Sequence, residues 1–130
     1  MTSERAFPTL SVDDLRISAA VSDGVLRVTM SGSVEMRDSR SVLDPYWADL
    51  DAEALRLGIR KIEIDLRSVA FMNSSGLLTF VRWLTRLKER TEGTGYKVLF
   101  HYDTNVTWQR TNVPVLAKLA PGAVHLTESA

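Results

Sequence analysis

Apolar and polar side chains alternate along the first third of the chain. From Leu15 to Val21 every second residue is apolar, and the same alternation returns over residues 25–30. The two stretches are separated by a Ser-Asp-Gly turn at 22–24. A period of two bounded by turn residues predicts a β-hairpin.

The stretch KIEIDL at residues 61–66 alternates charged residues with Ile or Leu. A central parallel strand covered on both faces would instead be continuously apolar. The alternation therefore predicts a sheet with helices packed mainly on one face and its other face partly wet.

Three stretches have helical spacing. The first is predicted to begin at Asp44, with Asp as the N-cap and Pro45 in the first turn, and to end at Gly58. The second follows the Ser-Ser-Gly sequence at 74–76, and the third covers residues 106–119 with an interruption near Pro114.

With further strands at 96–102 and 123–127, the predicted order is β-β-α-β-α-β-α-β. We expect one α/β domain over residues 13–130, with a mixed sheet of about four or five strands. Residues 1–12 are polar and contain a proline, which favours a flexible N-terminal arm.

Composition narrows the function classes. The 130 residues carry 16 basic and 16 acidic side chains, so the formal net charge is zero, and there is no cysteine. Nucleic-acid binding needs clustered positive charge, and a metal site needs ligands at suitable spacing, which His101 and His125 do not show. We expect a cytoplasmic protein with no membrane span, no metal and no cofactor.

The sequence FMNSSGLL at residues 71–78 joins a predicted strand to a predicted helix. Asn73 or Ser74 could cap the helix, and Gly76 could ease the turn. An exposed serine there could also accept a phosphate, because the helix dipole stabilises the added charge.

Two other interpretations of this turn fit poorly. A nucleophilic serine normally has the G-x-S-x-G sequence and a paired histidine, and a nucleotide loop has G-x-x-x-x-G-K-[ST]. Neither sequence is present. A small serine hydrolase stays only as a remote alternative, and we expect no catalytic residue.

The stretch IEIDLRSVAFMNSSGLL resembles the signature of STAS domains, the fold of bacterial anti-sigma-factor antagonists. The matching positions, in order, are Asp65, Leu66, Val69, Phe71, Met72, Ser74, Ser75, Gly76 and Leu77. The resemblance implies that Ser74, or alternatively Ser75, is phosphorylated by a histidine-kinase-like serine kinase that doubles as an anti-sigma factor. It also implies that a PP2C-type phosphatase reverses the modification.

The same resemblance implies a partner-binding surface around this turn. Its expected members are Gly32, Ser33, Val34, Glu35, Arg37, Arg40, Asn73, Ser74, Ser75, Gly76 and Leu77. The first four correspond to a Gly-Glu-Leu-Asp loop of the family, and Arg37 or Arg40 is hypothesised to pair with phosphoserine.

The chain departs from the family pattern at two informative places. Asn73 replaces the usual Asp, which removes a charge beside the phosphoacceptor. Trp108-Gln109-Arg110 lies where the third helix begins, and the family pattern assigns it no role. It is either a core tryptophan with a solvated arginine or an aromatic-plus-arginine anchor for a partner.

The predicted function is therefore a phosphorylation-switched binding module in a partner-switching pathway. It would bind its kinase or anti-sigma partner while Ser74 is unphosphorylated. The alternative is a STAS scaffold or sensor without a phosphoswitch that regulates a non-sigma target.

Overall fold

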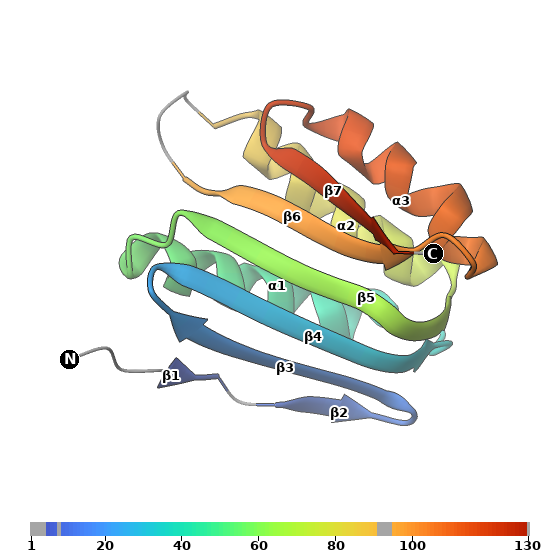
Figure 1. Cartoon of the computed structure of the whole chain (residues 1–130). Coiled ribbons are helices and arrows are strands. Elements are labelled where there is room, and N and C mark those ends of the chain that lie inside the picture. The colour runs from blue at the N-terminus through green and yellow to red at the C-terminus, as the bar shows by residue number, and fades with distance from the viewer. Residues whose placement is uncertain (1–4, 8, 91–94, 130) are drawn as a thin grey trace.

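The computed structural model describes residues 5–7, 9–90 and 95–129. The strands within these residues are β1 (Arg5–Ala6), β2 (Leu10–Val12), β3 (Leu15–Ser22), β4 (Val25–Val34), β5 (Lys61–Met72), β6 (Lys97–Asp103) and β7 (Val124–Ser129). The helices are α1 (Ser39–Arg56), α2 (Ser74–Lys88) and α3 (Thr107–Leu119). Figure 1 shows one twisted sheet with the helices behind it.

The sheet is mixed, as predicted. Its order is β1-β3-β4-β5-β6-β7, and β2 also pairs with β3. The pairs β1–β3, β2–β3 and β3–β4 are antiparallel, whereas β4, β5, β6 and β7 run parallel. The α/β fold class is confirmed.

The N-terminal segment adds strands that the sequence analysis did not predict. Arg5–Ala6 pairs with Ala20–Val21, and Leu10–Val12 pairs with Leu15–Ile17. The described sheet is therefore seven-stranded. Flexibility of the 1–12 arm and the boundary at residue 13 stay predictions, but the described part of this segment hydrogen-bonds to the sheet edge.

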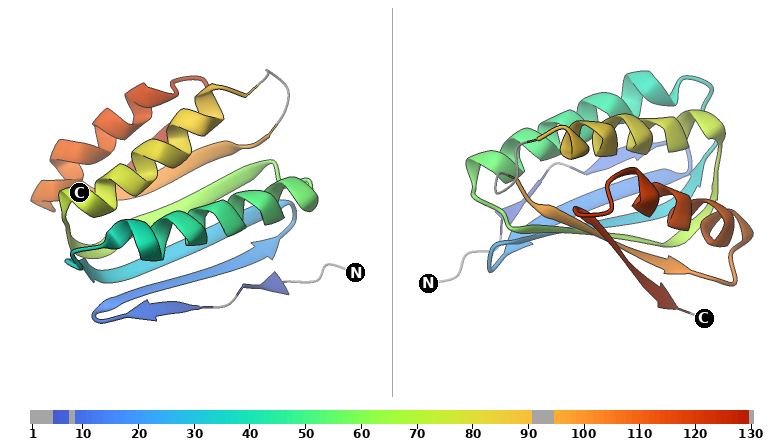
Figure 2. Two further views of the ribbon diagram at one scale, coloured as in Figure 1. Left: turned by 180° about the vertical axis from the view of Figure 1, so that it is seen from behind. Right: turned by 90° about the horizontal axis from the view of Figure 1, so that it is seen from above.

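All three described helices cover the same face of the sheet (Figure 2). Along the first half of β5, Ile62, Ile64 and Leu66 are fully buried beneath these helices, and the alternate residues are partly exposed. Stacked aromatic rings fill the layer between helices and sheet, with Trp47 and Trp83 centroids 5.3 Å apart. The predicted one-sided sheet is confirmed.

The predicted start of the first helix at Asp44 is wrong. The helix begins at Ser39, and Asp38 is its N-cap, accepting a hydrogen bond from the Ser41 amide at 3.2 Å. Pro45 lies inside the helix and removes one backbone hydrogen bond. The extra N-terminal turns bury Leu43 completely, which offsets that loss.

Two further helix boundaries test the sequence analysis. Gly58 follows the C-cap of α1 with a φ of +67°, which confirms it as the helix stop. The predicted interruption near Pro114 is wrong, because α3 continues through this residue.

Candidate functional site

The turn between β5 and α2 places Ser74 at the first position of a helix. Asn73 is the N-cap, and its side-chain oxygen accepts a hydrogen bond from the Gly76 amide at 2.9 Å. Ser74 is exposed and Ser75 is half-buried. The first turn of α2 contains no acidic side chain, so the positive end of the helix dipole is not neutralised there.

The end of β4 lies directly beside this turn. Ser33 is the register partner of Phe71, and Val34 is the partner of Met72. The Asn73 amide then donates to the Val34 carbonyl at 3.0 Å. The segment 32–34 is thus strand, not the loop that the sequence analysis expected, and it lies in contact with the serine turn.

Asn73 also reaches the connection between β4 and α1. Its side-chain Nδ2 donates to the Met36 carbonyl at 3.0 Å, and the Ser39 hydroxyl donates to the same oxygen at 3.1 Å. An aspartate could cap α2 but could not donate the bond to Met36. Asn73 therefore makes a tie between the two sides of the site that an aspartate could not make.

Gly76 is needed for close packing rather than for a special turn. A Cβ on this residue would lie 2.7 Å from Val34 Cγ1 and 3.0 Å from Met72 Cγ. The expectation that Gly76 eases a tight turn is wrong, because this glycine lies inside α2 and is not among the positive-φ residues. Its role is to let the first turn of α2 press onto the ends of β4 and β5.

A buried hydrogen-bond relay fixes this first turn from the other side. Trp47 Nε1 on α1 donates to Thr79 Oγ1 at 3.0 Å. Thr79 Oγ1 in turn donates to the Gly76 carbonyl at 2.7 Å. Both side chains are buried, so the relay is shielded from competing water.

Two irregularities in β5 change which of its side chains face outward. The register with β4 shifts between Thr29 and Ser31 and again between Gly32 and Ser33, each time with an additional residue on β5. The first shift turns Val69 into the core, and the second restores the original phase, so Met72 is buried like Leu66 and Phe71 is 46% exposed. Leu78, one turn into α2, is 51% exposed. Exposed apolar side chains thus flank the serine turn on both elements.

The sequence analysis did not identify Phe71 and Leu78 as surface residues. Alternation continued from Lys61 and Glu63 would have placed Phe71 outward, because the two register shifts together restore the phase of β5. A signal for Leu78 was nevertheless present, because the apolar stripe of α2 runs through Phe80, Trp83, Leu84 and Leu87 at helical spacing and Leu78 lies off it.

An acidic hollow lies between the turn at residues 13–14 and the segment 33–36. It has a volume of about 260 Å³ and is lined by Asp13, Asp14, Ser33, Glu35 and Met36. The turn that carries Asp13 and Asp14 packs tightly against β4, because a Cβ on Gly32 would lie 1.9 Å from the Asp14 carbonyl oxygen. The Gly32 backbone has a φ of +93°, which also favours glycine.

The remaining predicted members of the surface lie in different settings. Leu77 is half-buried and packs against the core, and Glu35 is exposed. Arg40 lies in α1, 3.7 Å from Asp44, and Arg37 is exposed next to Met36. A pairing of Arg37 or Arg40 with phosphoserine stays a prediction.

Trp108 and Gln109 support the strand that leads to the serine turn. The pairing of β5 with β6 ends at Asp65. Beyond it, Gln109 Nε2 donates to the Leu66 and Val69 carbonyls at 2.7 and 2.9 Å, and Trp108 Nε1 donates to Val69 at 2.7 Å. Trp108 is a core residue and Arg110 is exposed, as the first of the two interpretations had it.

His101 lies on β6 and His125 on β7. His101 Nε2 lies 3.2 Å from Glu63 Oε1. No hydrogen bond within the described residues joins Ser74 or Ser75 to either ring. The described part of the chain also has no helix long and apolar enough to cross a membrane, and no cluster of His, Asp and Glu suited to a metal.

Comparison with solved structures identifies the fold. An anti-sigma factor antagonist from Mycobacterium paratuberculosis is 23% identical with a TM-score of 0.59, over 89% of this chain and 90% of that one. The chain has the fold of this antagonist. SiaC of Pseudomonas aeruginosa is 20% identical with a TM-score of 0.55, over 98% of this chain and 97% of that one.

A structure of apo-SiaC agrees with this result. It is 22% identical with a TM-score of 0.59, over 98% of this chain and 99% of that one. No protein-family model and no curated protein matches the chain. The similarity to these solved structures thus extends over most of the chain.

Proposed function

We propose that this chain is a protein-binding module of the anti-sigma-factor-antagonist type, switched by phosphorylation of Ser74. It acts in the bacterial cytoplasm and binds a histidine-kinase-like serine kinase or anti-sigma partner while Ser74 is unmodified. A PP2C-type phosphatase restores the binding state. The chain itself needs no catalytic activity in this scheme.

The observation that carries the proposal is the position of Ser74. Its hydroxyl is exposed at the first residue of α2, between the exposed Phe71 and Leu78 and beside the 32–36 segment. A phosphate there would be stabilised by the helix N-terminus, so the fold can accept it. It would also add up to about two negative charges at the centre of an apolar contact surface, which costs binding.

The surroundings of Ser74 indicate the chemistry of the partner. Phe71 and Leu78 offer apolar contact area, and the hollow beside Ser33 carries three carboxylates, those of Asp13, Asp14 and Glu35. A partner with apolar side chains at the centre of its interface and a basic side chain at the edge would complement this surface.

The proposal is tested with the kinase-like protein encoded nearest to this chain's gene. Calorimetry should show that Ser74→Ala binds it like the wild type, whereas Ser74→Asp binds at least about tenfold more weakly, because a charge enters the interface. Thr111→Asp is the control, since it adds the same charge at an exposed position of α3 outside the proposed surface and should leave the affinity unchanged. Equal affinities of Ser74→Ala and Ser74→Asp would exclude the switch.

One observation favours the alternative of a scaffold or sensor without a phosphoswitch. Asn73 uses both atoms of its amide in structural hydrogen bonds, at the position where the family usually has an acidic residue. Intact-mass measurement after co-expression with the kinase decides between the two functions. One added phosphate that disappears in Ser74→Ala supports the switch, and an unmodified mass supports the scaffold.

A further inference from the structure

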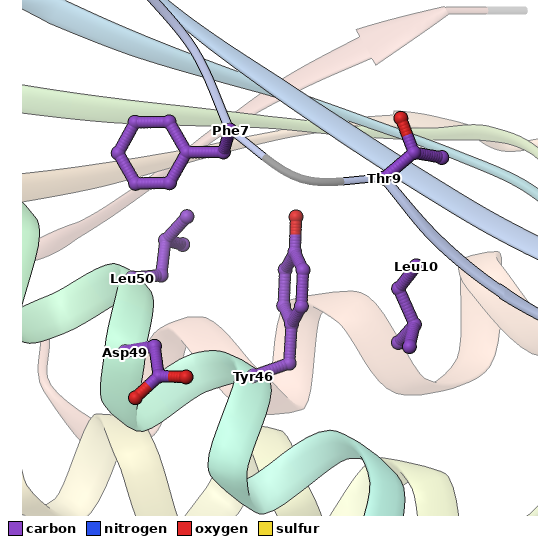
Figure 3. Close-up of a pocket in the computed structure, with 6 residues that line it drawn as sticks. All are labelled: Phe7, Thr9, Leu10, Tyr46, Asp49 and Leu50. Carbon is purple, nitrogen blue, oxygen red and sulfur yellow. The ribbon is translucent and has the colours of Figure 1, made fainter.

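The N-terminal segment of the chain covers one flank of α1. Phe7 and Leu10 lie opposite Tyr46 and Leu50 across a small hollow (Figure 3). All four side chains belong to the hydrophobic core or pack against it. The flank of α1 that faces α2 has no such cover from the N-terminal segment, and it adjoins the turn that carries Ser74.

The first turns of α1 and α2 lie next to each other, and the two helices run in the same direction (Figure 2). Ser39 at the start of α1 and Asn73 at the cap of α2 both bond the Met36 carbonyl oxygen. The outer surface of this helix pair therefore begins at the turn that carries Ser74. A partner that contacts Ser74 reaches the helix pair without crossing another element.

Two arginines share a single carboxylate on this surface. Both oxygens of Asp44 on α1 accept from Arg82 on α2, at 2.8 and 3.1 Å. Arg40, one turn before Asp44, lies 3.7 Å from the same carboxylate, which is too long for a hydrogen bond. Its side chain is 75% exposed and makes no hydrogen bond within the part of the chain that the structure describes. The α1–α2 arginine cluster, consisting of Arg40, Asp44 and Arg82, thus carries one positive charge in excess.

The neighbours of the cluster leave this excess in place and add apolar surface. Arg37 and Asp38 are exposed and contribute one charge of each sign. Leu78, one turn before Arg82 on α2, is an exposed leucine, and Pro45 beside Asp44 is exposed and uncharged. A guanidinium with unused donors next to an apolar side chain complements a carboxylate that is itself flanked by an apolar side chain.

A second charged region borders the same turn. The hollow beside Ser33 is lined by the carboxylates of Asp13, Asp14 and Glu35, so its charge is opposite to that of the cluster. Two regions of opposite sign on one surface favour a single orientation of a partner, because the reversed orientation would bring like charges together.

We propose that the α1–α2 arginine cluster binds an acidic side chain of the kinase or anti-sigma partner, and this proposal rests on the proposed function. The partner's carboxylate accepts from the Arg40 guanidinium, and an adjacent apolar side chain of the partner packs on Leu78. Together with the acidic hollow, the cluster fixes the orientation in which the partner docks.

The test is a calorimetric titration of the whole chain with the kinase-like protein encoded nearest to its gene. Arg40→Glu should weaken binding at least about tenfold, because it replaces attraction by repulsion. Asp44→Asn should instead strengthen binding about threefold, because it removes the internal carboxylate that competes for both arginines. If the cluster had only a structural role, both variants would bind more weakly, and that result would overturn the proposal.

Two further variants make the test specific. Arg27→Glu is the matched control, since it reverses the same charge at an exposed position of β4 between Leu26 and Val28, which are buried beneath the helices. It should leave the affinity unchanged. Arg40→Ala removes the charge without adding another and should bind about threefold more weakly. It replaces Arg40→Glu if circular dichroism shows that the charge reversal unfolds the chain.

Ser74→Asp in the same titration separates the arginine cluster from the proposed switch. Weaker binding by Ser74→Asp, with wild-type affinity in Arg40→Glu, would overturn the cluster's role alone. Absence of binding by the wild type would overturn both. Self-association of the chain that Arg40→Glu abolishes would assign the surface to a second copy and would also overturn the proposal.

Discussion

The N-termini of α1 and α2 meet at the Met36 carbonyl, but they are held in different ways. Asp38 caps α1 through Ser41, three residues away, in an exposed setting. Asn73 caps α2 and also bonds Met36, which is 37 residues distant in the sequence. Both caps bond an amide three residues away, but the start of α2 has in addition a long-range tie that forms only where β4, β5 and α2 have come together.

The strand entering α2 extends this contrast. Leu66 and Val69 on β5 have their carbonyls satisfied by Trp108 and Gln109 from α3, across about 40 residues of chain. A surface serine thus stands on a rigid base, which suits a residue that a partner must recognise in one geometry. Substitutions at Gln109 and at the two helix caps should separate long-range support of this site from local capping.

The largest effect is expected for Gln109→Leu. Its fully buried amide accepts from the Asp103 amide at 2.8 Å and donates to two carbonyls of β5. Leucine would leave the Asp103 amide and the Leu66 carbonyl without these bonds, so we expect a loss of about 3 kcal/mol in the free energy of unfolding. Urea denaturation measures it.

Arg110→Ala is the control for this variant, because Arg110 is the exposed neighbour on the same turn. Its free energy of unfolding should change by less than about 0.5 kcal/mol. Similar losses in the two variants would show that α3 does not support β5 through Gln109.

A smaller effect is expected at Asn73. Asn73→Ala removes the cap of α2 and should cost about 1 kcal/mol in the free energy of unfolding. Asn73→Asp keeps an acceptor for the Gly76 amide and loses only the donor to Met36, so its loss should be smaller. Hydrogen exchange at the Gly76 amide should stay slow in Asn73→Asp and become fast in Asn73→Ala.

The long-range tie at Asn73 is contradicted if Asn73→Asp leaves hydrogen exchange around Met36 and Ser39 unchanged. The Met36 carbonyl accepts from both Asn73 Nδ2 and the Ser39 hydroxyl, and a carboxylate at position 73 cannot donate to it. Such a result would make the α2 cap as local as that of α1.

The smallest effect is a difference in pH dependence between the two caps. Hydrogen bonds from the Ser41 side chain and backbone hold the pKa of Asp38 below its ordinary value of 3.8. The Asp38 cap thus stabilises the fold above that ordinary value, and its contribution disappears as the pH falls through the lowered pKa. The Asn73 cap does not titrate.

Asp38→Asn should therefore differ from the wild type by less at about pH 2 than at about pH 7. Unfolding measured by circular dichroism at both values checks this. Since other carboxylates titrate equally in both proteins, only the difference between them is informative, and parallel pH profiles would contradict the role of Asp38.

The sequence predicted the fold class and the serine turn because both depend on local patterns. Alternation over residues 15–30 and 61–66 determined the hairpin and the one-sided sheet. The signature at 65–77 pointed to Ser74, and Gly58 marked a helix end through its own backbone preference. The start of α1 was missed because Asp44-Pro45 is also a good local start signal, and burial of Leu43 favours the longer helix.

The surroundings of Ser74 were decided only by tertiary structure. The register shifts relative to β4 turn Val69 into the core, and the close approach of Val34 and Met72 requires Gly76. The Met36 carbonyl joins both helix starts, and Gln109 replaces a missing strand neighbour. Each of these features pairs groups far apart in the chain, and no local pattern encodes such a pairing. The chain by itself thus determined that a serine begins a helix here, and packing determined the surface around it.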